Sequence, residues 1–264
     1  MEEVERTLVR FLKDYAASSG RDKAVVGLSG GVDSAVSAAL AARSFGAENV
    51  HALVLPSASS PQEDLDDAAD VAQWLGIDVR TVSIQPLLDA LDHADPGFSR
   101  EGLGNSAARI RMILLFEEAR RLGGLVVGTG NKSEVLVGYF TKFGDGGVDV
   151  QPLADLYKTQ VFALAEHVGI PQRVRDKAPS ARLWAGQTDE AELGMPYATL
   201  DRVLLGLEVR LDAKLIAQTV GVTEEAVERI ARMWAVSQHK RRMPMVPKFG
   251  MRTPGIDWRD ATLR

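Results

Sequence analysis

The segment AVVGLSGGVDSAVSAALAARSFG, residues 24–46, joins three patterns in a single short stretch. Its first part, 24–28, is a continuous apolar run of the kind found in buried strands. The loop SGGVDS (29–34) follows, and the alanine-rich remainder is typical of a buried helix that ends at Gly46. A strand, a glycine loop and a helix in this order predict the first unit of a parallel α/β sheet.

The same alternation continues on both sides of this segment. Spaced apolar residues from Val4 to Tyr15 predict an amphipathic helix before it. After it we expect strands at 51–56, 78–84 and 125–129, and helices from a capping box at Ser60-Pro61-Gln62-Glu63 to Leu75, just after 84, and at 105–122, 155–169, 199–218 and 224–239. The pattern predicts an α/β fold: a doubly wound, mostly parallel sheet flanked by helices, with C-terminal helices and an irregular tail. We expect residues 1–264 to form a single domain.

Composition narrows the classes of function. The chain has 264 residues and a net charge of −5, which does not favour nucleic acid as a partner. Its apolar runs are too short to cross a membrane, and the acidic N-terminal segment is unlike a signal peptide, so we expect a cytoplasmic protein. It contains no cysteine and four histidines, which excludes thiol chemistry and favours a hard metal ion such as Mg²⁺.

The SGGVDS loop has the features of a phosphate site. Adjacent glycines let backbone N–H groups surround an anion, and the helix N-terminus adds partial positive charge. Asp33 beside such a site is explained if Mg²⁺ lies between its carboxylate and the phosphates. The structural alternative is a glycine turn with Asp33 as a helix cap. The loop resembles that of the PP-loop ATP pyrophosphatases, which cleave ATP between its α- and β-phosphates.

A second loop, GTGNKSE (128–134), follows the last predicted strand. If the sheet reverses its strand order beside the first strand, this loop faces SGGVDS across a crevice. Glu134 could then share Mg²⁺ with Asp33, while Thr129 contacts a nucleotide. Taken alone, the loop is equally a helix turn capped by a glutamate.

Four further sets of charged residues lie beside glycines or on helix faces. The segment 138–149 places Lys142 among glycines and aromatic residues, where either a ligand pocket or a solvated loop would fit. Lys158 on a helix and the cluster His239-Lys240-Arg241-Arg242 would ordinarily be solvent-exposed. Arg109 and Arg111 point to different helix faces, and we expect Arg111 to have a structural partner.

Together these segments resemble the NAD synthetase family, in the family's order and over most of the chain. The segments are SGGVDS, NSAARIRM, GTGNKSE, GYFTKFGDGGVDVQPLADLYKTQV, PSARLWAGQTDEAELG and HKRRMP. FTKFGDGG and GQTDEAELG are more specific than the phosphate loop. They separate this family from other PP-loop enzymes, such as GMP synthetase and argininosuccinate synthetase.

The resemblance implies ATP-dependent amidation of deamido-NAD by ammonia through an acyl adenylate, giving NAD, AMP and pyrophosphate. It also implies a homodimer and roles for individual residues, Asp33 and Lys158 being catalytic. The implied ATP contacts are Gly27, Leu28, Ser29, Gly30, Gly31, Val32, Asp33, Ser34, Thr129, Lys158 and Ser180; the implied Mg²⁺ ligands are Asp33 and Glu134; the implied deamido-NAD contacts, partly across the dimer interface, are Arg109, Lys142, Asp149, His239 and Lys240.

The chain departs from the family pattern in the identity of two residues and in the spacing of two prolines. Ser180 stands where some members have threonine, and Arg182 where many have glycine. The spacing of Pro244 and Pro247 also differs. Since we expect no glutaminase domain and the chain has no cysteine, free ammonia is the expected nitrogen donor. Two alternatives remain: another PP-loop carboxylate-adenylating ligase, and a non-catalytic nucleotide sensor on the same fold.

Overall fold

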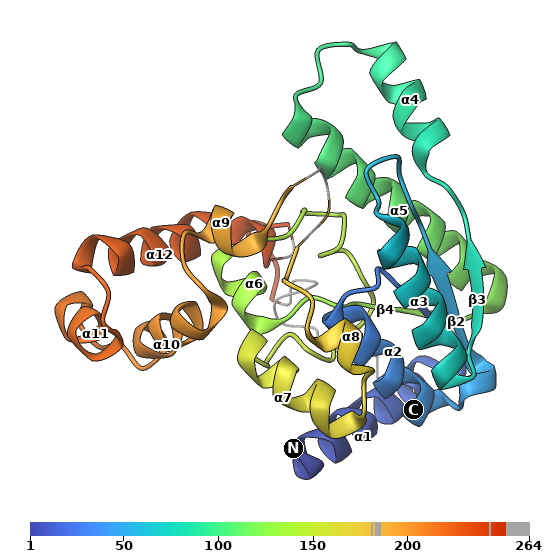
Figure 1. Ribbon diagram of the computed structural model, residues 1–264, viewed down its shortest axis with the longest axis horizontal. Coiled ribbons are helices and arrows are strands. Elements are labelled where there is room, and N and C mark those ends of the chain that lie inside the picture. Colours follow the sequence, from blue (N-terminus) through green and yellow to red (C-terminus); the bar gives the residue numbers. More distant parts are fainter. Residues whose placement is uncertain (181, 183–185, 243, 252–264) are drawn as a thin grey trace.

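The computed structural model describes residues 1–180, 182, 186–242 and 244–251. Four parallel strands form the sheet, in the order β3-β2-β1-β4 (Figure 1). They are β1 (Ala24–Gly27), β2 (Val50–Val54), β3 (Asp78–Thr81) and β4 (Leu125–Val127). The strand order reverses beside β1, which meets the condition set in the sequence analysis, so the loops after β1 and β4 open at the same edge.

The helices follow the predicted alternation. In the N-terminal part they are α1 (Glu2–Ser19), α2 (Val32–Phe45), α3 (Gln62–Leu75), α4 (Gln85–Ala94), α5 (Arg100–Leu122) and α6 (Lys132–Val137). Beyond these lie α7 (Lys158–Val168), α8 (Gln172–Arg175), α9 (Asp189–Leu193), α10 (Tyr197–Glu208), α11 (Ala213–Val220) and α12 (Glu224–Val236), with 3-10 turns η1 (Ala47–Asn49) and η2 (Ser237–Lys240). No helix of the described residues is long and apolar enough to cross a membrane.

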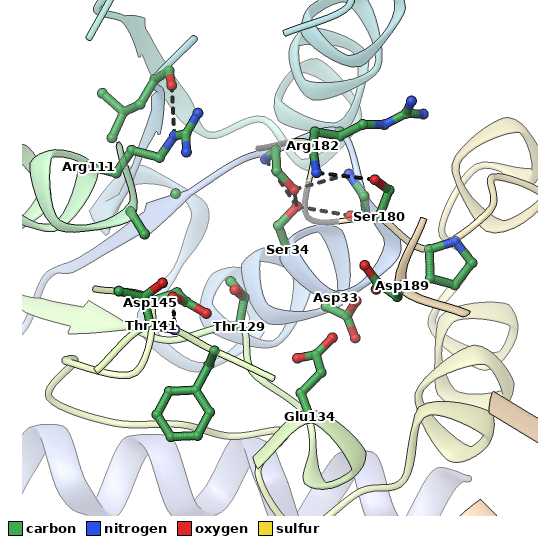
Figure 2. Close-up of a pocket in the computed structure, with 18 of the residues that line it drawn as sticks. Asp33, Ser34, Arg111, Thr129, Glu134, Thr141, Asp145, Ser180, Arg182 and Asp189 are labelled. Atoms are coloured by element: carbon green, nitrogen blue, oxygen red, sulfur yellow. Dashed lines mark hydrogen bonds between the residues drawn. The ribbon is translucent and has the colours of Figure 1, made fainter. Parts of the chain in front are cut away.

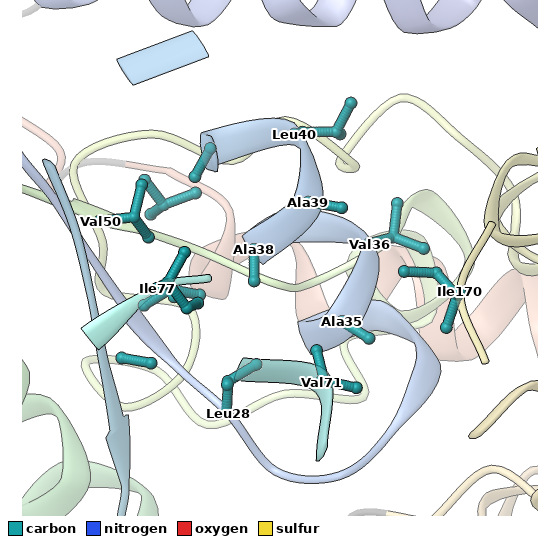
Figure 3. Close-up of a cluster of buried hydrophobic side chains, with 14 of the residues drawn as sticks. Leu28, Ala35, Val36, Ala38, Ala39, Leu40, Val50, Val71, Ile77 and Ile170 are labelled. Atoms are coloured by element: carbon teal, nitrogen blue, oxygen red, sulfur yellow. The ribbon is translucent and has the colours of Figure 1, made fainter. Parts of the chain in front are cut away.

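The two faces of the sheet are covered by different helices because side chains alternate along each strand. Ala24 and Val26 of β1 pack into a core with α1, α2, α3 and α7. Val25 points to the opposite face, into a core with α4 and α5. The alanines of α2 allow this helix to lie close to the sheet (Figure 3), and Leu40 of the same helix is completely buried. The α/β fold predicted from the sequence is therefore confirmed.

A third core lies outside the sheet. Leu193, Leu200, Leu204 and Ile216 from α9, α10 and α11 pack with residues of α12. In Figure 1 these helices project from the sheet domain beside α6 and α7. They therefore hold the C-terminal residues 237–242 against α6: Arg241 donates to the carbonyls of Val135 at 2.9 Å and Leu136 at 2.8 Å.

Several predicted boundaries are wrong, each for a local reason. The helix expected from 105 begins at Arg100, because Ser99 caps it by accepting the amide of Gly102 at 3.0 Å. The single helix expected over 199–218 is two helices, since Arg210 has a φ of 61° and Asp212 caps α11.

The start of α3 and the length of the third strand also differ from prediction. The helix begins at Gln62, with Pro61 as the residue before it, and Ser60 Oγ accepts the amide of Ser57 at 3.1 Å instead of capping the helix. The strand expected over 78–84 ends at Thr81. It is an exposed edge strand, because its outer side has no neighbour within the described sheet.

Candidate functional site

A cavity of about 740 Å³ lies at the carboxyl edge of the sheet, where the loops after β1, β2 and β4 meet. Its floor is the segment 27–34, and its walls come from 53–56, α5, 127–129, 138–141 and 177–180. Lys158 and Glu134 also line it. Segments separated by about half of the chain thus converge on one space, as expected for a doubly wound sheet.

The phosphate loop has the conformation that its glycines predict. Gly30 has a φ of 76°, and a Cβ placed on it would lie 2.3 Å from the backbone oxygen of Asp64. Ser34 Oγ accepts the amide of Ser29 at 3.2 Å and donates to the carbonyl of Gly31 at 2.9 Å, which closes the loop. The N-terminus of α2 follows directly, so backbone donors and the helix dipole face the cavity together.

Two carboxylates that line this cavity point toward each other (Figure 2). Asp33 comes from the first turn of α2, and its Oδ1 accepts from Asn131 Nδ2 at 3.1 Å. Glu134 comes from α6, where it forms a capping box with Asn131. The prediction that the two loops lie opposite each other is confirmed, and Asn131 connects them.

Lys158, the first residue of α7, lies between the two carboxylates. Its Nζ contacts Asp33 Oδ2 and is 3.9 Å from Glu134 Oε1. The side chain is only 2% exposed and lies near the rings of Phe162 and Tyr197. The expectation that a helical lysine is solvated does not hold here, because α7 places it at the centre of the site.

The surroundings of Glu134 and Lys158 shift the pKa values of both side chains. Burial raises the pKa of Glu134 to about 8, and the nearby charge of Asp33 adds to the shift. Burial alone would lower the pKa of Lys158, but Asp33 and Glu134 outweigh it and the pKa is raised. The lysine therefore stays charged at neutral pH and balances Asp33, while Glu134 carries its proton most of the time in the absence of a cation.

These residues fit magnesium only in combination with a nucleotide. Among the described residues, no group of three or more His, Cys, Asp or Glu is placed to hold a metal ion. Asp33 and Glu134 offer two neighbouring carboxylates that point toward each other in the cavity. Mg²⁺ is often held by one or two carboxylates, with substrate phosphates and water completing its octahedron, and this donor set matches that pattern.

Replacing Glu134 with glutamine is expected to change how stability depends on pH. Since the folded pKa is about 8 and the ordinary value is 4.5, the folded state holds a proton that the unfolded chain has lost between these values. The stability that this proton contributes is present below pH 4.5 and is lost as pH rises towards 8. Thermal unfolding without metal or nucleotide should show wild type losing stability relative to Glu134→Gln over this window. Parallel curves would contradict the assignment, and exposed Glu228→Gln is the control.

The other end of the cavity contains residues that the sequence did not single out as ligands. Arg111 Nε donates to the Leu55 carbonyl at 3.0 Å, as its expected structural role requires, yet the residue also lines the cavity. Asn105 accepts from Thr141 Oγ1 at 2.7 Å. Burial raises the pKa of Asp145, although the residue keeps surface accessible through the cavity. The glycines around Asp145 in FGDGG were the available signal.

The sequence patterns did not identify a third group of polar residues at the cavity. Tyr139 donates to Glu192 Oε2 at 2.7 Å, and Gln187 Nε2 approaches the Tyr139 hydroxyl at 3.3 Å. Asp189 accepts from buried Tyr197 at 3.1 Å. All but Tyr197 line the cavity. GQTDEAELG stood out as a family segment, but its contact with Tyr139, through Glu192 of α9, is a tertiary contact that the local sequence does not reveal.

The predicted site residues divide into two sets. All predicted ATP and metal residues line the cavity, as does Lys240, which donates to the carbonyls of Gly138 and Phe140 at 2.7 and 2.8 Å. The remaining predicted substrate residues, Arg109, Lys142, Asp149 and His239, are not among the described residues that line it. The residues predicted to bind ATP and Mg²⁺ therefore share one cavity, whereas four of the five predicted deamido-NAD residues lie outside its described lining.

The four predicted substrate residues outside the cavity lining make other contacts or lie at the surface. Arg109 Nε donates to the Lys142 carbonyl at 3.3 Å, and both residues lie near the surface. Asp149 Oδ2 accepts the amide of Val126 at 2.7 Å, which fixes the loop to β4. His239 is exposed on η2. Their binding roles stay predictions.

The departures from the family pattern lie beside the cavity. Ser180 Oγ donates to the Gln187 carbonyl at 2.6 Å. Arg182 has a φ of 49°, the left-handed region that favours glycine, which is the residue we expect there in relatives. Ala181, Leu183, Trp184 and Ala185 of the PSARLWAGQTDEAELG segment, and Met243 of HKRRMP, lie outside the described residues.

Comparison with known proteins gives a consistent result. The family described as NAD synthase matches residues 4–244. The NH(3)-dependent NAD(+) synthetase of Chlorobaculum tepidum is 45% identical over 259 residues, which cover 98% of this chain and 93% of the relative.

Solved structures agree. A structure titled NMN synthetase from Francisella tularensis is similar with a TM-score of 0.84 and 39% identity, over 94% of this chain and 98% of the neighbour. NH3-dependent NAD synthetase from Campylobacter jejuni, in complex with nitrate, has a TM-score of 0.80 and 30% identity over the same fractions. The phosphate loop, the neighbouring carboxylates and these full-length similarities lead to one conclusion: the chain belongs to the NAD synthase family.

Proposed function

We propose that this protein is a ligase that converts deamido-NAD, ammonia and ATP into NAD, AMP and pyrophosphate through an acyl adenylate. The observation that carries the proposal is the convergence of the phosphate loop, Asp33, Glu134 and Lys158 on one cavity. The family of the chain supports it, and favours a ligase over a nucleotide sensor.

The reaction must first activate a carboxylate. A carboxylate oxygen of the nicotinate ring attacks the α-phosphorus of ATP, and the bond from that phosphorus to pyrophosphate breaks. Ammonia then attacks the acyl carbon and loses a proton, and AMP leaves as the amide forms. Neither step needs a nucleophilic side chain, so the protein contributes binding, orientation and charge stabilisation.

The residues of the cavity suit these tasks. Backbone N–H groups of 29–34 and the start of α2 hold the phosphates, and Lys158 meets the negative charge that develops on the leaving pyrophosphate. Thr129 and Ser180 supply hydroxyls at the nucleotide. Asp33 and Glu134 would hold Mg²⁺, which when bound neutralises phosphate charge.

A homodimer would complete the second substrate site. The exposed face of α5 carries Arg109, Ile113 and Phe116 at helical spacing, and the two apolar side chains are 65% and 40% exposed. A second copy on this face would bury them and bring further groups towards Arg109 and Lys142. Sedimentation velocity tests this: a monomer at micromolar concentration would remove the dimer from the proposal.

His239→Ala tests the predicted second substrate site. We expect the KM for deamido-NAD to rise about tenfold, as for loss of a hydrogen bond to a charged group, with the KM for ATP nearly unchanged. The matched control is exposed His93→Ala on α4. Steady-state kinetics with each substrate varied in turn gives both constants, and equal effects on both substrates would place His239 elsewhere.

The identity of the carboxylate substrate needs its own comparison. The similarity to a neighbour named NMN synthetase makes nicotinate mononucleotide a second candidate. Purified protein should be given ATP, Mg²⁺ and ammonium chloride with either the dinucleotide or the mononucleotide, and with glutamine in place of ammonium. We expect NAD and AMP in equal amounts from the dinucleotide and ammonium. Faster amidation of the mononucleotide would reassign the substrate, and AMP without either amide would point to another carboxylate.

Location in the cell is proposed on composition alone. The acidic, cysteine-free chain fits a cytoplasmic enzyme, and fractionation of cells that express a tagged protein would test it.

A further inference from the structure

Beside the phosphate loop lies a network of charged residues that the reaction scheme above does not use, although three of its members, Asp64, Lys177 and Arg182, line the same cavity. Lys177 Nζ donates to Asp64 Oδ1 at 2.6 Å and also contacts Asp67 Oδ2. Its third contact is the carbonyl oxygen of Gly30, at 3.4 Å. The lysine therefore connects α3 to the centre of the phosphate loop.

Burial makes this network costly to disturb. Asp67 is completely buried, Asp64 is 6% exposed, and the side chain of Lys177 is 12% exposed. The start of α3 packs directly against the loop, since a Cβ on Gly30 would lie 2.3 Å from the backbone oxygen of Asp64. Charged groups with so little access to water keep their geometry only while each keeps its partners.

The charges of the network balance. Arg173 contacts Asp67 and Asp70, and Arg182 Nε is 3.3 Å from Asp64 Oδ2. Three cations, Lys177, Arg173 and Arg182, thus face three carboxylates, Asp64, Asp67 and Asp70. Because the cluster is neutral overall, it adds little net attraction for a triphosphate. Its role is therefore to hold the phosphate loop and the neighbouring segments in place.

The network also reaches a second part of the nucleotide site. Lys177 is three residues before Ser180, whose hydroxyl lines the cavity. The segment between them is held by the amide of Asp189, which donates to the Pro179 carbonyl at 3.1 Å. A displacement of Lys177 would therefore move Ser180 as well as Gly30.

The peptide bond between Gly30 and Gly31 links the position of Lys177 to the binding of phosphate. Its carbonyl oxygen accepts from Lys177, and its N–H, on Gly31, points the opposite way because the peptide is planar and trans. That N–H makes a long contact of 3.3 Å to Ser29 Oγ, which a stronger anionic acceptor could replace.

We propose that Lys177, held by Asp64 and Asp67, is a positioning residue that fixes the Gly30–Gly31 peptide and the Ser180 segment for the triphosphate of ATP. This inference rests on the proposed function for the identity of the nucleotide. It assigns Lys177 no contact with the reacting atoms.

Binding of ATP compared with binding of adenosine tests the proposal, because the two ligands differ only in the phosphates. Calorimetry without the carboxylate substrate gives both dissociation constants. For Lys177→Met we expect ATP to bind at least about tenfold more weakly, as for loss of a hydrogen bond to a charged group, with adenosine affinity kept within about twofold. Lys214→Met, an exposed lysine on α11, is the matched control and should match wild type.

A second variant guards against loss of folding. Lys177→Met leaves a carboxylate without its cation, whereas Asp64→Asn/Lys177→Met removes one charge of each sign and still lacks the Gly30 contact. The double variant should show the same selective loss for ATP. Wild-type preference for ATP in either folded variant, or equal losses for ATP and adenosine, would overturn the proposal. Failure of the proposed function would instead appear in the wild-type protein, as ATP binding without amide formation.

Discussion

Asp33→Asn is expected to lower NAD formation by about a hundredfold to a thousandfold, the range seen when one preorganised group that stabilises the transition state is removed. The carboxylate of Asp33 lies in the first turn of α2, contacts Lys158 and accepts from Asn131 at 3.1 Å. Asparagine keeps the size of the side chain but loses the negative charge that would hold Mg²⁺ and orient Lys158. Initial rates of AMP and NAD release at saturating ATP measure the effect.

The fold should survive this change. Asp33 is only partly buried and does not cap α2, whose N-cap is Gly31, and asparagine can still accept from Asn131. A matched control is Asp92→Asn on exposed α4, which should keep wild-type rates. Near-normal turnover by Asp33→Asn, with its circular dichroism unchanged, would remove Asp33 from the reaction.

Lys158→Met is expected to reduce kcat by about a hundredfold or more and to change the KM for deamido-NAD by much less. Methionine retains most of the buried stem and its packing near Tyr197, so the lost property is the ammonium group between Asp33 and Glu134. That group is needed when charge develops on pyrophosphate, a demand greater in the transition state than in the bound substrate.

The control for this lysine is Lys132→Met. Lys132 is also an ion-paired lysine at a helix start, 2.8 Å from Glu208, but it does not line the cavity. Its loss should leave kcat within about twofold, as for a partly exposed ion pair. If Lys158→Met chiefly raised the KM for deamido-NAD, its assignment to the leaving group would be wrong.

The core of the fold could be predicted because its signals are local. The run 24–28, two glycines and an alanine-rich segment specify a strand, a turn and a helix through backbone sterics and apolar periodicity alone. The same signals placed the predicted ATP and metal residues of the 27–34 loop correctly at the carboxyl edge of the sheet. Family resemblance added Ser180 and Lys240, which local pattern does not distinguish from ordinary surface residues.

Helix boundaries were less predictable because single capping contacts decide them. Ser99 extended α5 by five residues beyond the expected start, and Asp212 with the left-handed Arg210 divided one expected helix in two. At Ser60, a turn within 57–60 competed successfully with the expected capping box. Such competitions are settled by differences of about 1 kcal/mol, which a pattern of residue types does not resolve.

The amino-acid pattern was sufficient for the parallel α/β sheet, the glycine loop and, once the strand order reverses beside β1, the two neighbouring carboxylates, since these follow from short-range sterics and the rules of parallel sheets. Tertiary packing alone placed buried Lys158 between those carboxylates and joined Lys177 to Asp64, Asp67 and Gly30. Except for Lys158 and Glu134, these pairs are separated by more than a hundred residues along the chain, and nothing in the local sequence of the two lysines distinguishes them from solvated charges. Their role arises from burial, which removes water and leaves each charge dependent on a partner supplied by another element of the fold.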